Sequence, residues 1–150
     1  MIATAHQADV SFALENPEPL KEVSMFNMPK IKAIAALDGV SHVDFDQCRF
    51  GAETQKPTRF LCYKVKHESV ANHRCNHPKK EWKGNDGKVY KASHERLVGR
   101  KRIRDGKEEY ASKALGNYPS KLCKAMAEDI AKVNTKRARL ARGLPGENLP

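Results

Sequence analysis

The stretch from residue 66 to residue 107 limits most strongly what this chain can fold into. It is crowded with Lys, Arg and His, is interrupted by four glycines, and is almost free of apolar periodicity. Such a segment supplies little hydrophobic core, so we expect it to form a long surface excursion. The core must then come from the flanking sequence, and a chain of 150 residues is long enough for one modest core.

The flanking sequence alternates between strand and helix patterns. Apolar runs predict strands at residues 10–14, 43–50 and 59–65, and helical spacing predicts helices at 29–37 and from 120 onward. The final helix is expected to turn Leu122, Met126, Ile130 and Val133 toward the core. These strands and helices are expected to form one sheet with helices packed on it, which is compatible with an α/β fold.

The predicted organisation is one domain with a tail. The domain covers residues 1–135, with 66–107 as its basic, loop-rich insertion, and a basic tail over 136–150 is expected to be disordered at its end. The mean hydropathy of -0.71 and the lack of a long apolar run exclude a membrane-spanning helix. Four scattered cysteines form no disulfide pattern, which favours an intracellular protein, cytoplasmic or in the nucleoid or nucleus.

A formal net charge of +10 favours a phosphate-bearing partner, and DNA is the partner we expect. Trp82 and Tyr90 are placed to stack on bases. The alternative is a charged surface that is simply solvated. The predicted phosphate contacts are Lys79, Lys80, Lys83, Arg100, Lys101, Arg102 and Arg104.

Three polar clusters carry the other functional signals. They are Glu15-Asn16-Pro17, the stretch 46–51 with Gln55-Lys56-Pro57-Thr58-Arg59 after it, and Gly116-Asn117-Tyr118-Pro119. Each cluster alone is compatible with ordinary turn chemistry, because Asn-Pro starts turns and Pro is well tolerated in the first turn of a helix. Their order along the chain is more informative than any one of them.

In that order the clusters resemble the C5-cytosine DNA methyltransferase family. There a Glu-Asn-Val element precedes a Gln-x-Arg-x-Arg stretch and a Gly-Asn-x-x-Pro helix opening. The likeness extends to methylase-like proteins of phages and mobile elements, which share Glu-Asn-Pro, Lys-Pro-Thr and a final Pro-x-x-Leu-Cys helix, here residues 119–123. The resemblance implies part of a Rossmann-like methyltransferase sheet with a long basic insertion.

The resemblance also implies roles for individual residues. Glu15 would be the carboxylate that binds a flipped cytosine, with Arg59 and Gln55 beside it. Gly116, Asn117 and Pro119 would line one side of a pocket for S-adenosylmethionine. Pro17 in place of Val, and Pro57-Thr58 within the arginine pattern, depart from the family and leave the target base open.

Two elements of the family have no counterpart in this sequence. No cysteine follows a proline, as the family's nucleophile does, and no glycine-rich cofactor loop follows a strand. We therefore expect S-adenosylmethionine binding only if a separate N-terminal methyltransferase half or self-association completes the fold. Whether the chain is an enzyme stays open. A small basic nucleic-acid-binding protein of a phage or mobile element, without catalysis, is the alternative.

A metal site is a further possibility. Cys75, His77 and His94 are candidate zinc ligands, with Cys62 or Cys123 as a distant fourth, although only the first two are closely spaced. The alternative is a solvated loop whose histidines add charge at low pH. A metal-dependent nuclease is disfavoured, because the nearby acids Glu81, Asp86 and Glu95 match no metal-binding pattern.

Overall fold

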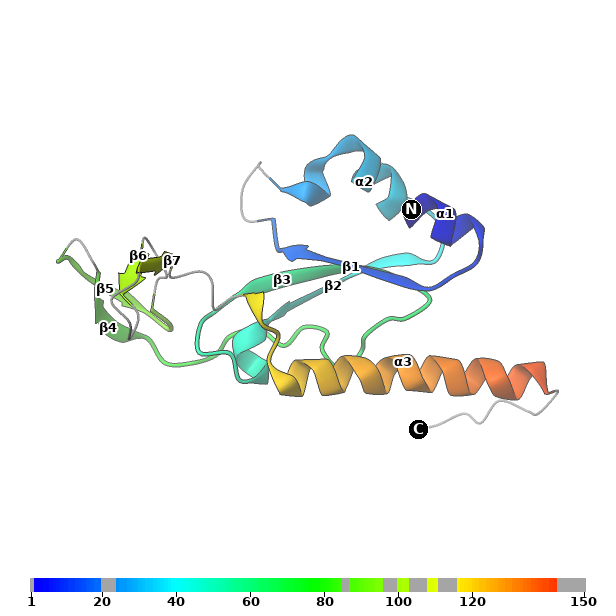
Figure 1. Ribbon diagram of the computed structural model, residues 1–150. Coiled ribbons are helices and arrows are strands. Elements are labelled where there is room, and N and C mark those ends of the chain that lie inside the picture. Colours follow the sequence, from blue (N-terminus) through cyan, green and yellow to red (C-terminus); the bar gives the residue numbers. More distant parts are fainter. Residues whose placement is uncertain are drawn as a thin grey trace.

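A computed structural model describes residues 2–19, 24–84, 87–95, 100–102, 108–110 and 116–142. One three-stranded sheet forms the middle layer, with short helices over one face and one long helix along the other (Figure 1). Two small hairpins extend from one end of this sheet. The expected combination of helices and strands is thus confirmed.

The sheet consists of β1 (Phe12–Pro17), β2 (Val40–Asp46) and β3 (Pro57–Tyr63) in the order β1-β3-β2. β3 pairs antiparallel with both neighbours, so β1 and β2 run in the same direction on either side of it. All strand pairings among the described residues are antiparallel. A Rossmann-like sheet of neighbouring parallel strands is therefore not shown within the described part of the chain.

Short helices cover one face of the sheet: α1 (Ile2–Gln7), the 3-10 helix η1 (Met25–Asn27) and α2 (Pro29–Ala35). The predicted helix at 29–37 is confirmed as α2. Pro29 at its first turn fits the start of a helix, since proline lacks the N–H that would be unpaired there. After α2 the chain turns at Gly39, whose φ of 73° favours glycine, and enters β2.

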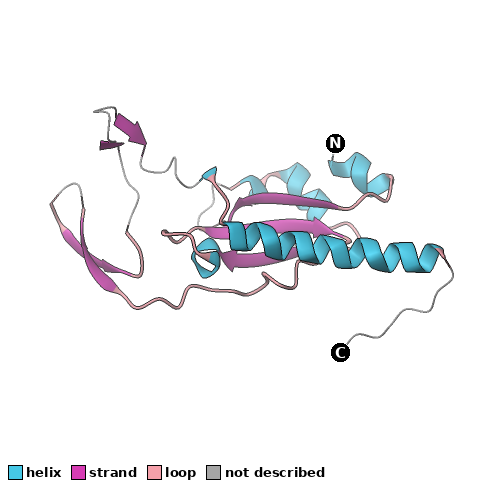
Figure 2. Ribbon diagram, turned by 60° about the horizontal axis from the view of Figure 1, so that its bottom comes forward, coloured by secondary structure: helices cyan, strands magenta, loops and turns pink. Residues whose placement is uncertain are grey.

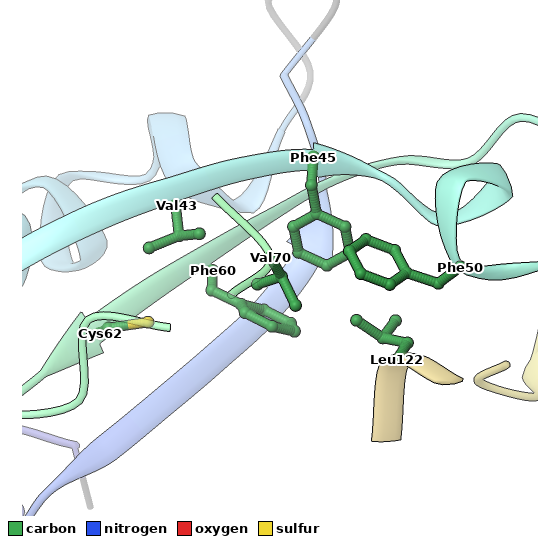
Figure 3. Close-up of a cluster of buried hydrophobic side chains, with 7 residues drawn as sticks. All are labelled: Val43, Phe45, Phe50, Phe60, Cys62, Val70 and Leu122. Carbon is green, nitrogen blue, oxygen red and sulfur yellow. The ribbon is translucent and has the colours of Figure 1, made fainter. Parts of the chain in front are cut away.

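The opposite face of the sheet packs against α3 (Ser120–Ala141), which lies along the strands (Figure 2). The core between them is a cluster of buried apolar side chains drawn in Figure 3. The Phe45 ring meets the Phe60 ring edge-on, with centroids 5.0 Å apart, and Leu122 of α3 is fully buried beside them. The cluster comprises Val43, Phe45, Phe50, Phe60, Cys62, Val70 and Leu122.

The buried face of α3 differs in part from the predicted one. Leu122 is buried as expected, but Ile130 is 42% exposed and its neighbour Asp129 is 6% exposed. Asp129 turns inward because its Oδ2 accepts hydrogen bonds from the Ser69 backbone N–H, at 3.1 Å, and from the Ser69 hydroxyl. The expectation for Ile130 was wrong because a buried carboxylate, and not an apolar side chain, fixes this turn of the helix.

The predicted strand at 43–50 is also corrected. Only β2, ending at Asp46, is extended, and residues 47–50 form the 3-10 helix η2 (Gln47–Phe50). It ends at Gly51, which adopts the left-handed region with φ of 96°. In β1, by contrast, the strand reaches Pro17, so Glu15 lies within the last residues of the paired strand.

The described part of the segment after β3 contains buried residues and strands that the sequence did not predict. His67 and Val70 are buried against the core, and two antiparallel hairpins follow: β4 (Lys80–Lys83) with β5 (Val89–Ala92), and β6 (Arg100–Arg102) with β7 (Glu108–Tyr110). The expectation of a purely superficial segment was therefore wrong near residues 67–70. None of the described helices is long and apolar enough to cross a membrane. α3 continues through residue 136, where the basic tail was expected to begin.

The register of α3 gives a test of stability. Leu122→Ala should lower the free energy of unfolding by about 2 to 5 kcal/mol, because it leaves a cavity in the core. Leu140→Ala is the matched control, since Leu140 on the same helix is 58% exposed and its truncation should cost under about 0.5 kcal/mol. Denaturant unfolding of both variants measures the difference, and equal losses would contradict this packing.

Candidate metal centre and strand-end carboxylate

Four potential metal ligands converge at the end of the sheet that carries the hairpins. The side chains are Cys48, Cys75, His77 and His94, and their ligand atoms all lie within 4.8 Å of one another. The Cys75 sulfur is 3.5 Å from His77 Nδ1 and 3.4 Å from His94 Nε2. In a tetrahedral zinc site with ordinary bond lengths, a sulfur and a nitrogen ligand are about 3.6 Å apart. The arrangement could therefore hold a metal ion.

Three separate segments supply these ligands. Cys48 comes from η2, Cys75 and His77 from the loop before β4, and His94 from the residues just after β5. In η2 the backbone N–H of Gly51 donates to the carbonyl oxygen of Cys48 at 3.2 Å, which makes a tight turn around this thiol. The cluster joins the end of β2 to the β4–β5 hairpin.

Surrounding groups hold the ligands in place. His94 Nδ1 lies 2.9 Å from the carbonyl oxygen of Glu53, which leaves Nε2 facing the cluster, as in metal sites where the second ring nitrogen donates to a carbonyl. The backbone N–H of Cys75 donates to Asp46 Oδ2 at 2.7 Å, and Asp46 is almost fully buried. These contacts orient two ligands without using their metal-binding atoms.

The pKa of the Cys48 thiol is raised to about 12. Burial is the main cause, and the hydrogen bond with Cys75 is the second. A bound divalent cation has the opposite effect, since it favours the thiolate. The chemistry of the cluster thus depends on whether a cation occupies it.

Sequence reasoning identified three of the four clustered residues. Cys75, His77 and His94 lie together as predicted, but the expected fourth ligand was wrong: Cys62 is buried in the core and Cys123 is exposed on α3. The fourth member is Cys48. The one signal for it is a glycine three residues later, which permits the tight turn around the thiol.

A second site of interest surrounds Glu15. Opposite residues of antiparallel strands face the same side, so Glu15, paired with Phe60, points toward α3. Its Oε1 is buried and accepts no hydrogen bond from any described residue, and Lys56 Nζ lies 3.5 Å away as an ion pair. The ion pair with Lys56 offsets part of the free-energy cost of burying an oxygen that accepts no hydrogen bond from these residues.

Tyr118 completes this group from the segment that precedes α3. Lys56 Nζ lies 5.4 Å from the centre of the Tyr118 ring. Burial, and then hydrogen bonding with the Glu15 carboxylate, raise the pKa of the Tyr118 phenol well above its usual range. Glu15, Lys56 and Tyr118 each come from a different one of the three polar clusters. The structure therefore brings the clusters together through two residues that sequence reasoning did not single out.

Arg59 and Gln55 are placed differently. Arg59 lies on the other face of the sheet, where its Nε and Nη2 donate to the two oxygens of Asp44 at 2.6 and 2.7 Å. Gln55 is exposed, and its amide donates to Asp46 Oδ2 at 3.4 Å. The structure does not bring either side chain to Glu15. Arg59 instead links two strands, and Gln55 contacts the carboxylate that holds Cys75.

The predicted cofactor-lining residues form the approach to α3. Gly116 and Asn117 are exposed, and Pro119 caps the helix through its carbonyl oxygen, which accepts from the backbone N–H groups of Leu122 and Cys123. Of the predicted phosphate contacts, Lys79, Lys80 and Lys83 are exposed on or beside β4, whereas Arg104 lies outside the described residues. Arg100, Lys101 and Arg102 form β6, and Trp82 pairs with Tyr90 across the β4–β5 hairpin.

The Asp44–Arg59 pair predicts a pH dependence of stability. Hydrogen bonding to Arg59 lowers the pKa of Asp44 in the folded protein. The pair therefore contributes fully to folding stability above about pH 4, the pKa of Asp in the unfolded chain, and this contribution is lost as pH falls through the lower pKa of the folded state. Asp44→Asn should cost roughly 1 to 3 kcal/mol at pH 7 and less near pH 2. Denaturant unfolding at both pH values checks this, and an Asp38→Asn variant, altered at an exposed turn, should show no such difference.

Comparison with protein-family models, with curated proteins and with solved structures gives no match to this chain.

Proposed function

We propose that this chain is the base-binding, C-terminal portion of a DNA cytosine methyltransferase-like protein and does not transfer methyl groups by itself. The observation that carries the proposal is the buried Oε1 of Glu15 at the meeting point of the three polar clusters, which has an ion-pair partner in Lys56 but accepts no hydrogen bond from the described residues. A carboxylate in this position can accept a hydrogen bond from the exocyclic amine of cytosine.

The directions of β1 and β2 are compatible with part of a Rossmann-like methyltransferase sheet. β1 and β2 run in the same direction and are connected through α2, a strand–helix–strand unit of the kind that builds Rossmann-like sheets. In such folds an antiparallel strand is common at the edge of the sheet, whereas β3 lies between β1 and β2 and is antiparallel to both. β1 and β2 are each paired on one side only among the described strands, so a separate half or a second copy could extend the sheet.

S-adenosylmethionine binding is expected to be weak or absent in the isolated chain. Gly116, Asn117 and Pro119 would form one wall of its pocket, and the opposite wall would have to come from a separate methyltransferase half or from a second copy of the chain.

Binding to an unpaired cytosine tests the base-binding role. The chain should prefer a duplex with a cytosine opposite an abasic site over the fully paired duplex, measured by fluorescence anisotropy. Glu15→Gln should reduce that preference about tenfold, the effect of losing one hydrogen bond to a charged group. Glu128→Gln changes the net charge equally at an exposed helix position and is the matched control.

If the native chain shows no preference for unpaired cytosine, the base-binding proposal fails. Calorimetric titration with S-adenosylmethionine supplies the second readout, with no saturable binding expected. Saturable binding would show that the chain forms a cofactor site without another half and would contradict the expectation of weak or absent cofactor binding.

The second candidate function is nucleic-acid binding without any methylase role, in a protein of the cell interior. The β4–β5 hairpin favours it, because the Trp82–Tyr90 pair lies beside the exposed Lys80 and Lys83. Salt-sensitive binding that is equal for paired and unpaired cytosine would support this candidate over the first.

We further propose that the cluster of Cys48, Cys75, His77 and His94 binds zinc in a structural role. Two thiols and two imidazoles in tetrahedral reach are a typical zinc ligand set, and four protein ligands leave no open position for catalysis. The ion would fix the β4–β5 hairpin to η2 at the end of the sheet.

Metal analysis of the reduced, purified chain should find one zinc per molecule. Chelation should lower the melting temperature by roughly 10 °C. A bound ion stabilises the folded state by about 3 to 4 kcal/mol, and each kcal/mol changes the melting temperature of a chain of this size by about 2 to 4 °C. Cys48→Ser should abolish stoichiometric zinc, whereas Cys123→Ser, an exposed thiol on α3, should retain it. Retention of zinc by both variants would exclude Cys48 as a ligand.

A further inference from the structure

A pocket of about 460 Å³ lies between the second half of α3 and the loop that follows β3. These two segments lie at the end of the sheet away from the hairpins (Figure 1). Its described lining includes five basic side chains and only two acidic ones, Glu68 and Asp129. The basic residues are Lys64, Lys66, Lys132, Lys136 and Arg137. Neither the sequence motifs nor the proposed base-binding site accounts for this concentration of positive charge.

The acidic residues do little to neutralise it. Asp129 is almost fully buried and its Oδ2 accepts from Ser69, while its Oδ1 lies 3.4 Å from Lys132 Nζ. Lys64 pairs with Asp9 outside the lining. In the part of the chain that the structure describes, no carboxylate forms an ion pair with Lys66, Lys136 or Arg137. Three cations therefore remain in the lining, against the one exposed carboxylate of Glu68, and they leave an excess of positive charge for an anion.

One wall of the pocket contains a buried histidine with an unpaired ring nitrogen among the described residues. His67 is 1% exposed, and its Nδ1 has no hydrogen-bond partner among the described residues. Its ring lies 5.5 Å from the ring of Phe60, which holds it against the core. A buried ring nitrogen without a partner is uncommon, and a ligand or water that reaches it would satisfy it.

The loop that carries this wall is conformationally unusual. Lys64 and His67 both adopt left-handed backbone conformations, with φ of 65° and 47°. Non-glycine residues in this region are uncommon and concentrate at functional sites. Here the contact between Ser69 and Asp129 anchors the loop to α3.

We infer that this pocket binds phosphate groups. Because the pocket lies on a strongly basic chain, the phosphates of a DNA backbone are the favoured ligand. Lysine ammonium groups and an arginine guanidinium are the side chains that proteins use for phosphate oxygens. A small phosphate-bearing compound offers the same chemistry and is distinguished below. The inference does not rest on base binding by Glu15, which lies at another part of the sheet.

The test uses the full chain with two double variants of equal charge. Lys136→Gln with Arg137→Gln alters the pocket, and Lys121→Gln with Lys124→Gln alters α3 outside it; each removes two positive charges from the formal +10. The pocket variant should bind a paired DNA duplex about tenfold more weakly. The slope of log affinity plotted against log salt concentration should become less steep by about 1.8, which is about 0.9 for each lost phosphate contact. The control should stay within about twofold.

Inorganic pyrophosphate is the second probe, compared with sodium chloride at equal ionic strength. It should raise the melting temperature of the native chain and of the control but not that of the pocket variant. If this effect is lost while duplex affinity is unchanged, phosphate binding stands and a small compound is the source. If the two double variants behave alike with both probes, net charge alone explains binding and the inference is overturned.

Discussion

β3 lies between the other two strands, so every pairing in the main sheet passes through it. Its Phe60 packs into the core facing α3, while Arg59, the residue before it, crosses to the opposite face and holds Asp44 of β2. The residue that precedes the strand, Lys56, is thereby brought beside Glu15 of β1. Pairing with one central strand thus positions both the core and the carboxylate site, and disruption of β3 would remove the two together.

Asp46 connects this sheet to the metal-ligand cluster. It ends β2, is almost fully buried, and accepts hydrogen bonds from the backbone of Cys75 and from the side chain of Gln55. Because Lys56 directly follows Gln55, the cluster and the Glu15 site share a supporting segment. Asp46 therefore links two sites. Through Cys75 it fixes the metal-ligand cluster, and through Gln55 it fixes the segment that carries Lys56 to Glu15.

Local patterns in the sequence were sufficient for α2, α3 and β3, because apolar spacing reflects one element packing on one face. They failed at Ile130, since the inward turn of its neighbour Asp129 depends on Ser69, far away in sequence. The metal cluster was predicted in three of its members, and Cys48 was missed because spacing cannot show which distant turns meet. The partners of Glu15 were missed for the same reason: Lys56 and Tyr118 reach it from two other segments.

The metal-ligand cluster has a consequence for how the chain survives in a cell. Its first ligand is residue 48 and its last is residue 94, and the lysine-rich β4–β5 hairpin lies between His77 and that last ligand. A two-stranded hairpin alone is only marginally stable in water. If the cluster holds an ion as proposed, loss of that ion would free one end of the hairpin and make its backbone more accessible to proteases, so the lifetime of the full-length chain would depend on metal binding.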